Sequence, residues 1–256
     1  MAKTKRRPTL IVRVTDDFKV NLKKKYWFIE VEDYFWTRFA TKHFKNITFK
    51  EWLDYQLRPL KKTTVVRILS RKKPRNKQAS FAVGGLYDAY ADSKKQKAIW
   101  LAIYRFGWPA YSRSGVKERL TNLIIKTIVH ELNHTKQSRI RNYHMTTWDG
   151  DYYENPDEVD SYALNSAQSL VARFGVTDAK IRASKFCTKD SHCKEFIDYF
   201  KVKNIDVRQK FIKRVLKYIS IYESYEQEYG KDKLLCYHIR KKKALTRKRI
   251  KKQINA

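Results

Sequence analysis

The residues best suited to chemistry are two histidines and a glutamate in the pattern His-Glu-x-x-His, at His130, Glu131 and His134. On an α-helix, side chains four residues apart project from one face, about one turn apart. Two neutral imidazoles at this spacing can bind one Zn²⁺ ion, and a catalytic zinc needs a third protein ligand and an open position. The glutamate can then reach a water bound to the metal. The pattern therefore predicts a zinc site with Glu131 as catalytic base.

The flanking residues predict that this stretch is a helix with one face in a core. At about 100° per residue, a single stripe of large aliphatic side chains runs along it, formed by Leu120, Ile124, Ile125, Ile128 and Leu132. The two histidines lie on roughly the opposite side, together with Leu123 and Thr127. We expect a helix from residue 116 to about residue 137 that presents its histidines to a cleft.

A second helix is the best source of the third ligand. Asn155 is suited to the N-cap, Pro156 to the first turn, and Gly175 to the stop. Glu158 falls in the first turn, where a carboxylate also suits the positive end of the helix dipole. We predict Glu158 as the third zinc ligand, with helix capping as its alternative role. The sequence leaves other candidates open, namely Glu154, Asp151, Asp160 and His144.

The remaining pattern predicts an α+β fold, with an antiparallel or mixed sheet, a helix that carries the candidate site and a C-terminal helical extension. Strands are expected over residues 9–14, 63–69, 79–90 and 98–104, with Gly84-Gly85 as a β-bulge, and later helices over residues 194–201 and 207–229. We expect residues 1–8 to be a basic arm and residues 9–175 to be a domain that holds both motifs. Residues 176–239 would be a helical extension, and residues 240–256 a basic tail.

These features together resemble the zincin metallopeptidases, and among them the gluzincin-like enzymes, whose third ligand is a glutamate on a later helix. The segment Asn-Pro-Asp-Glu-Val-Asp-Ser-Tyr-Ala at residues 155–163 is similar to small metallopeptidases carried by bacteriophages. The resemblance covers about residues 79–164, and it implies that the sheet is zincin-like and that residues 9–175 form a zincin-like metallopeptidase domain. Gln137 and Ile140 stand where the metzincin pattern has its glycine and third histidine, so that ligand pattern is excluded.

The resemblance implies zinc-assisted hydrolysis of a peptide bond. A substrate backbone would pair with an antiparallel edge strand, either residues 98–104 or the hairpin partner of that strand. Glu131 would take the proton of the zinc-bound water and pass it to the leaving amine. Candidates for oxyanion support, chosen by residue type only and each with a structural role as the alternative, are Tyr152, Tyr153, Tyr162 and His144.

The second strong feature is a formal net charge of +31, which the two basic ends do not explain alone. Such a charge favours polyanions, so we expect non-specific binding of nucleic acid, with an acidic protein or an anionic membrane surface as weaker possibilities and a merely solvated surface as the other reading. The competing function is therefore a basic nucleic-acid-associated or virion structural protein that keeps a zincin fold without turnover.

Other sequence features narrow the class of protein. No apolar run of 18 residues is present, and the first residues lack the apolar core of a signal peptide, so we expect a cytoplasmic location, in a host cell or a virion if a phage encodes the chain. The three cysteines are odd in number and lack Cys-x-x-Cys spacing. This predicts neither a disulfide framework nor a cysteine zinc site.

Overall fold

The computed structural model describes residues 9–40, 48–70, 81–105, 116–144, 148–185 and 194–230. Helices and two small sheets make up these residues, which confirms the expected α+β class. The chain divides into two compact units after Trp148, whereas the domain expected from the sequence extends from residue 9 to residue 175. The basic arm and the basic tail lie outside the described residues. None of the described helices is long and apolar enough to cross a membrane.

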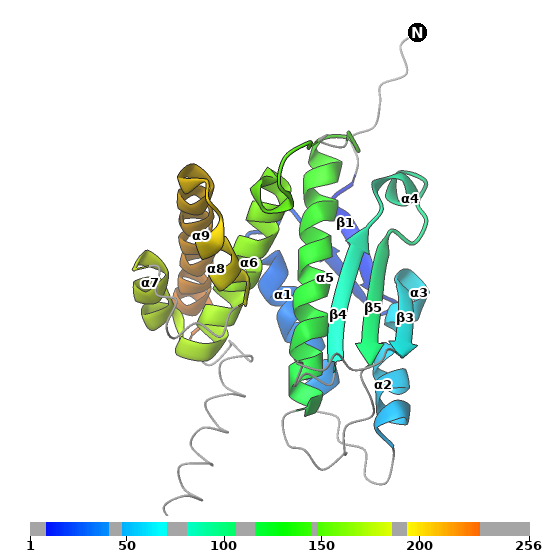
Figure 1. Ribbon diagram of the computed structural model, residues 1–256. Coiled ribbons are helices and arrows are strands. Elements are labelled where there is room, and N and C mark those ends of the chain that lie inside the picture. The colour runs from blue at the N-terminus through cyan, green and yellow to red at the C-terminus, as the bar shows by residue number, and fades with distance from the viewer. Residues whose placement is uncertain are drawn as a thin grey trace, which may run out of the picture. The chain divides into compact units, whose positions relative to one another are not determined.

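The first unit holds the strands and the long helix that carries the His-Glu-x-x-His pattern (Figure 1). Its elements in chain order are β1 (Ile11–Thr15), β2 (Phe18–Asn21), α1 (Trp27–Phe35), a short π-helix (Trp36–Ala40), α2 (Phe49–Leu57), α3 (Leu60–Thr63), β3 (Val65–Ser70), β4 (Phe81–Tyr87), α4 (Ala89–Ser93), β5 (Ile99–Arg105) and α5 (Val116–Ile140).

The larger sheet of this unit is mixed, with strand order β3-β5-β4. β5 lies in the centre, parallel to β3 and antiparallel to β4. The sequence left two candidates for the edge strand, residues 98–104 and their hairpin partner. Residues 98–104 lie in the central strand, and the hairpin partner, β4, forms an edge of the described sheet. β1 and β2 pair separately as an antiparallel hairpin. β2 was not expected, because its sequence FKVN is short and half polar.

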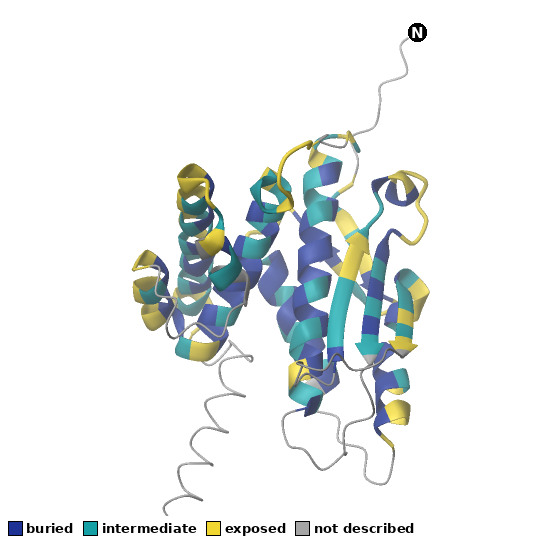
Figure 2. Ribbon diagram, in the orientation of Figure 1, coloured by how far each residue is buried: buried dark blue, intermediate teal, exposed yellow. Residues whose placement is uncertain are grey.

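Helix α5 packs chiefly against β4 and also against β5 and α1. The expected stripe is confirmed as core, since its five aliphatic side chains are at most 1% exposed. Figure 2 shows the helix mostly in the colour of buried residues. Helices α1 and α2 add aromatic side chains to the core, and Trp27, Phe28, Phe35 and Trp52 are almost completely buried. The many aromatic side chains near the N-terminus thus pack in the hydrophobic core.

A buried ion pair joins α5 to α4 and to β1. The Arg139 guanidinium donates to both carboxylate oxygens of Asp92, from Nε at 2.7 Å and from Nη2 at 2.5 Å. Its Nη1 donates to the carbonyls of Thr9 at 2.8 Å and Ile11 at 3.2 Å. The side chains are only 11% and 7% exposed, so this two-point contact fixes the C-terminal end of α5 against the first strand.

The second unit is helical. It contains a 3₁₀ turn, η2 (Tyr152–Glu154), followed by α6 (Pro156–Phe174), α7 (Val176–Ser184), α8 (Lys194–Lys201) and α9 (Ile205–Tyr229). α6 packs on α9, α7 and α8. The predicted signals at the ends of α6 are confirmed, because Asn155 Oδ1 accepts from the Asp157 amide at 2.9 Å and Gly175 ends the helix with φ at 80°. Gly230 ends α9 in the same way, with φ at 85°.

Candidate metal centre

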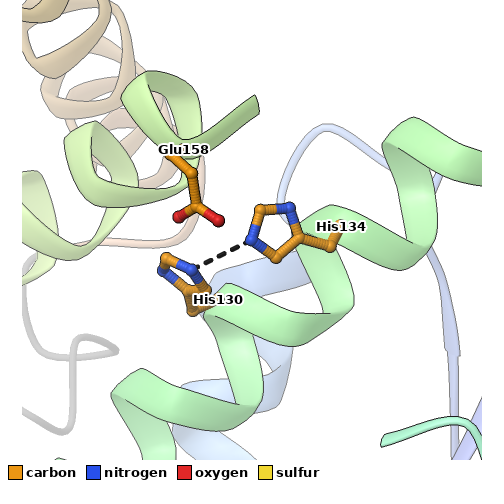
Figure 3. Close-up of side chains that lie close together, drawn as sticks. All are labelled: His130, His134 and Glu158. Carbon is orange, nitrogen blue, oxygen red and sulfur yellow. Dashed lines mark hydrogen bonds between the residues drawn. The ribbon is translucent and has the colours of Figure 1, made fainter. Parts of the chain in front are cut away.

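Helix α5 brings His130 and His134 together. Their Nε2 atoms are 3.0 Å apart, and their rings meet edge to face with centroids 4.7 Å apart (Figure 3). The Nδ1 atom of His134 lies 3.0 Å from Gln137 Oε1. A carbonyl oxygen accepts only from a protonated Nδ1, so this contact favours the tautomer whose Nε2 carries the lone pair. His130 is 8% exposed and His134 is half-buried, which limits competition from bulk water.

The geometry of this pair suits a tetrahedral metal ion. Two imidazole nitrogens bound to one zinc at about 2.0–2.1 Å lie about 3.3 Å apart. The observed separation of 3.0 Å is close to that value. Two imidazoles can meet so closely only by sharing a proton or a cation, because two bare lone pairs repel each other. The donor types and their spacing therefore fit the predicted ligand role of both histidines.

Glu131 lies on the side of α5 that faces the sheet edge. It is 5% exposed, and a Cβ atom built on Gly85 of β4 would be 2.8 Å from Glu131 Cδ, 2.6 Å from Thr127 Cγ2 and closer still to Glu131 Oε1. The missing side chain of Gly85 thus gives the carboxylate its place against β4. The predicted β-bulge at Gly84-Gly85 was wrong, because both glycines pair in regular register, with Ala102 and Leu101.

Glu158 belongs to the second unit, in the first turn of α6, and is half-buried. Figure 3 draws its side chain with the two histidines. Within this unit, the Tyr162 hydroxyl lies 3.3 Å from the Tyr152 hydroxyl. Although Tyr152 is 51% exposed, partial burial, then the hydrogen bond to Tyr162 and the charge of Glu158, raise its pKa above the ordinary value.

The alternative ligands are placed differently. Asp160 accepts a hydrogen bond from the Tyr218 hydroxyl at 2.9 Å and forms an ion pair with Arg214 at 3.0 Å, so it joins α6 to α9. Asp151 caps the turn η2 by accepting from the Tyr153 amide at 2.9 Å. Glu154 is half-buried within that turn. His144 is exposed, and its backbone amide donates to the Arg141 carbonyl that precedes it. Asp160 and Asp151 thus have structural roles of their own.

Tyr152, Tyr153 and Tyr162 form part of an aromatic cluster with Tyr199 and Phe211 inside the second unit. Tyr199 stacks on Phe211 with ring centroids 4.0 Å apart and is 0% exposed. Burial, followed by the charge of Glu158, raises the pKa of Tyr199 above its ordinary value. This cluster around the first turn of α6 was not foreseen, since residue 199 is far along the chain. It gives the tyrosines a packing role.

Comparison with known proteins gives no relative. No family model, no curated protein and no solved structure matches this chain. The case for a function therefore depends on the residues and geometry described above.

The contact between Glu131 and β4 gives a direct test. Gly85→Ala should lower the free energy of unfolding by about 1–3 kcal/mol, because the new methyl group overpacks the space that Glu131 and Thr127 fill. Gly84→Ala is the matched control, since a Cβ there meets only Tyr104 Cε2 at an ordinary 3.7 Å. Urea unfolding measures both variants, and Glu131→Ala should recover part of the loss at Gly85. Equal stability of the two alanine variants would show that the carboxylate does not need this space.

Proposed function

We propose that the protein is a zinc-dependent metallopeptidase of the zincin type, with His130, His134 and Glu158 as ligands. The pair of imidazole nitrogens 3.0 Å apart on α5, next to a buried glutamate, is the observation that carries this proposal. Glu158, half-buried in the first turn of α6, is the carboxylate that we propose as the third ligand. Two imidazoles and a carboxylate match the composition of known catalytic zinc sites.

When bound, a zinc ion would polarise the scissile carbonyl and lower the pKa of a coordinated water to about 7. Glu131 takes the proton of the attacking water and transfers it to the leaving amine. The close fit of its carboxylate against Gly85 limits its motion, which keeps the base in one position. The peptide backbone of the substrate pairs with β4, which forms an edge of the described sheet.

The metal should bind in one equivalent per chain, through both histidines and Glu158. His130→Ala and His134→Ala should each abolish zinc binding, and Glu158→Gln should weaken it by about tenfold or more, because each change removes one of three ligands. Glu154→Gln, a carboxylate change four residues earlier, is the matched control. Zinc content after dialysis and titration calorimetry give the readout. Full zinc occupancy in both histidine variants would remove the proposal.

Glu131→Gln should keep the zinc and the fold but lose hydrolysis by at least about 10²-fold, because an amide cannot accept the proton of the attacking water. Cleavage of a mixture of unstructured proteins, followed by mass spectrometry, measures this loss over many peptide bonds of different sequence at once. Circular dichroism and zinc content serve as controls for folding and metal. A variant that cleaves as fast as the parent would show that Glu131 is not the base. If the zinc-loaded parent cleaves nothing, the structural alternative is favoured.

The net charge of +31 supports a second function, association with nucleic acid. We propose that the protein acts near nucleic acid, in the host cytoplasm or a virion if a phage encodes it. In the alternative case it is a structural component there, with a zincin fold and no turnover. The described helix α9 contributes exposed cations to this charge, among them Lys210, Lys213 and Lys217. Binding through such charges follows phosphate density and not base sequence.

Affinity for duplex or single-stranded nucleic acid should therefore fall log-linearly with salt. The loss should be about three to five decades between roughly 50 and 200 mM if about six to ten phosphates are contacted. Removing residues 240–256, which include nine lysines and arginines, should flatten the slope without abolishing it. A chain of full length with those nine residues changed to glutamine is the matched control. Binding that does not respond to salt would exclude this partner.

A further inference from the structure

A cavity of about 710 Å³ lies within the first unit. It is lined by the start of β1, the end of α3, the connection from α4 to β5, and the last turn of α5 with the residues after it. None of the proposed zinc ligands lines it. Its volume is in the range of cavities that hold small organic ligands and cofactors, about 300–1,000 Å³.

The ionisable residues of the lining are five cations and one acid, namely Arg13, Lys62, Lys95, Lys97, Arg139 and Asp92. The acid is already neutralised, because Asp92 accepts two hydrogen bonds from Arg139. Lys62 forms an exposed ion pair with Asp16 at 2.8 Å, and exposed ion pairs contribute little to stability. Among the residues that the structure describes, Arg13, Lys95 and Lys97 have no carboxylate partner. The cavity thus keeps an excess of positive charge.

The backbone of the cavity wall is strained. Within the described part of the chain, three residues other than glycine have positive φ, namely Lys95 at 60°, Asn142 at 55° and Tyr143 at 65°, and all three line the cavity. Lys95 follows the end of α4, where its amide donates to the Asp92 carbonyl at 2.9 Å. Glycine is the usual residue at this position, because a Cβ atom disfavours the left-handed conformation. A lysine there places a charge in the wall at a cost in stability.

We propose that this cavity binds clustered phosphate groups, carried either by a free nucleotide or by a nucleic-acid strand. Lysine ammonium groups and the Arg13 guanidinium match phosphate oxygens in charge and hydrogen bonding. Hydroxyl and amide groups of Thr64, Gln96 and Asn142 add donors to the wall, and Val12 and Ile99 give an apolar surface for the remainder of the ligand. The site is independent of the metal centre, so it can exist whether or not the chain is a peptidase.

The test removes two lysines from the cavity of the full-length chain. Lys95→Gln/Lys97→Gln should weaken binding of pyrophosphate and ADP by about 100-fold, because two charge-assisted hydrogen bonds are lost and each is worth roughly one decade. Lys23→Gln/Lys203→Gln removes the same charge from exposed positions that do not line the cavity and should leave this binding unchanged. All variants are compared at the same zinc content. Adenosine, which lacks phosphate, should not bind.

A parallel titration with a short single-stranded oligonucleotide distinguishes a free nucleotide from a nucleic-acid strand as the carrier of the phosphate groups. Loss of ADP binding alone assigns the cavity to a nucleotide, and loss of oligonucleotide binding alone assigns it to a strand. Equal losses in the cavity and control variants, or no loss in either, would overturn the proposal. Lys95→Gly adds a second readout. It should raise the urea midpoint by relieving the backbone and should still weaken phosphate binding, and a gain in stability with unchanged binding would also overturn the proposal.

Discussion

The close packing of α5 on the edge of the mixed sheet is the constraint on which the first unit depends. Five aliphatic side chains hold one face of the helix in the core, and at about 100° per residue the same helix turns His130 and His134 away from that core. Glu131 lies between these two directions, and only a residue without a side chain at Gly85 lets it approach β4. The helix that builds the core therefore also fixes the spacing of His130, Glu131 and His134.

The middle and the C-terminal end of α5 serve different tasks. Near its middle, the two imidazoles form the pair suited to a metal, while near its C-terminus Arg139 joins Asp92 and the carbonyls of Thr9 and Ile11. A buried arginine with satisfied donors is costly to disturb, since removal of one partner leaves a buried charge. This anchor holds β1 in place and closes one side of the basic cavity. Metal chemistry and phosphate binding, as proposed, thus share one rigid helix.

Much of the helical structure was predictable because its information is local. The capping box at Thr48, the N-cap at Asn155 and the glycines at residues 175 and 230 mark their helices within a few residues. The role of Gly85 was not predictable, because the side chain that needs its space lies 46 residues later in the chain. The sequence left open whether β5 or β4 is the edge strand, since strand order is set by packing. For the site, the spacing of His130 and His134 is local, whereas a third ligand on another helix is not.

X-ray absorption at the zinc edge on the purified protein tests the central claim most directly. We expect a four-coordinate zinc with two imidazole nitrogens at about 2.0–2.1 Å and two oxygen ligands, one from a carboxylate and one from water. In Glu158→Gln the imidazole contributions should remain while the oxygen shell changes. A metal-free protein, or a zinc spectrum with sulfur ligands at about 2.3 Å, would contradict the account.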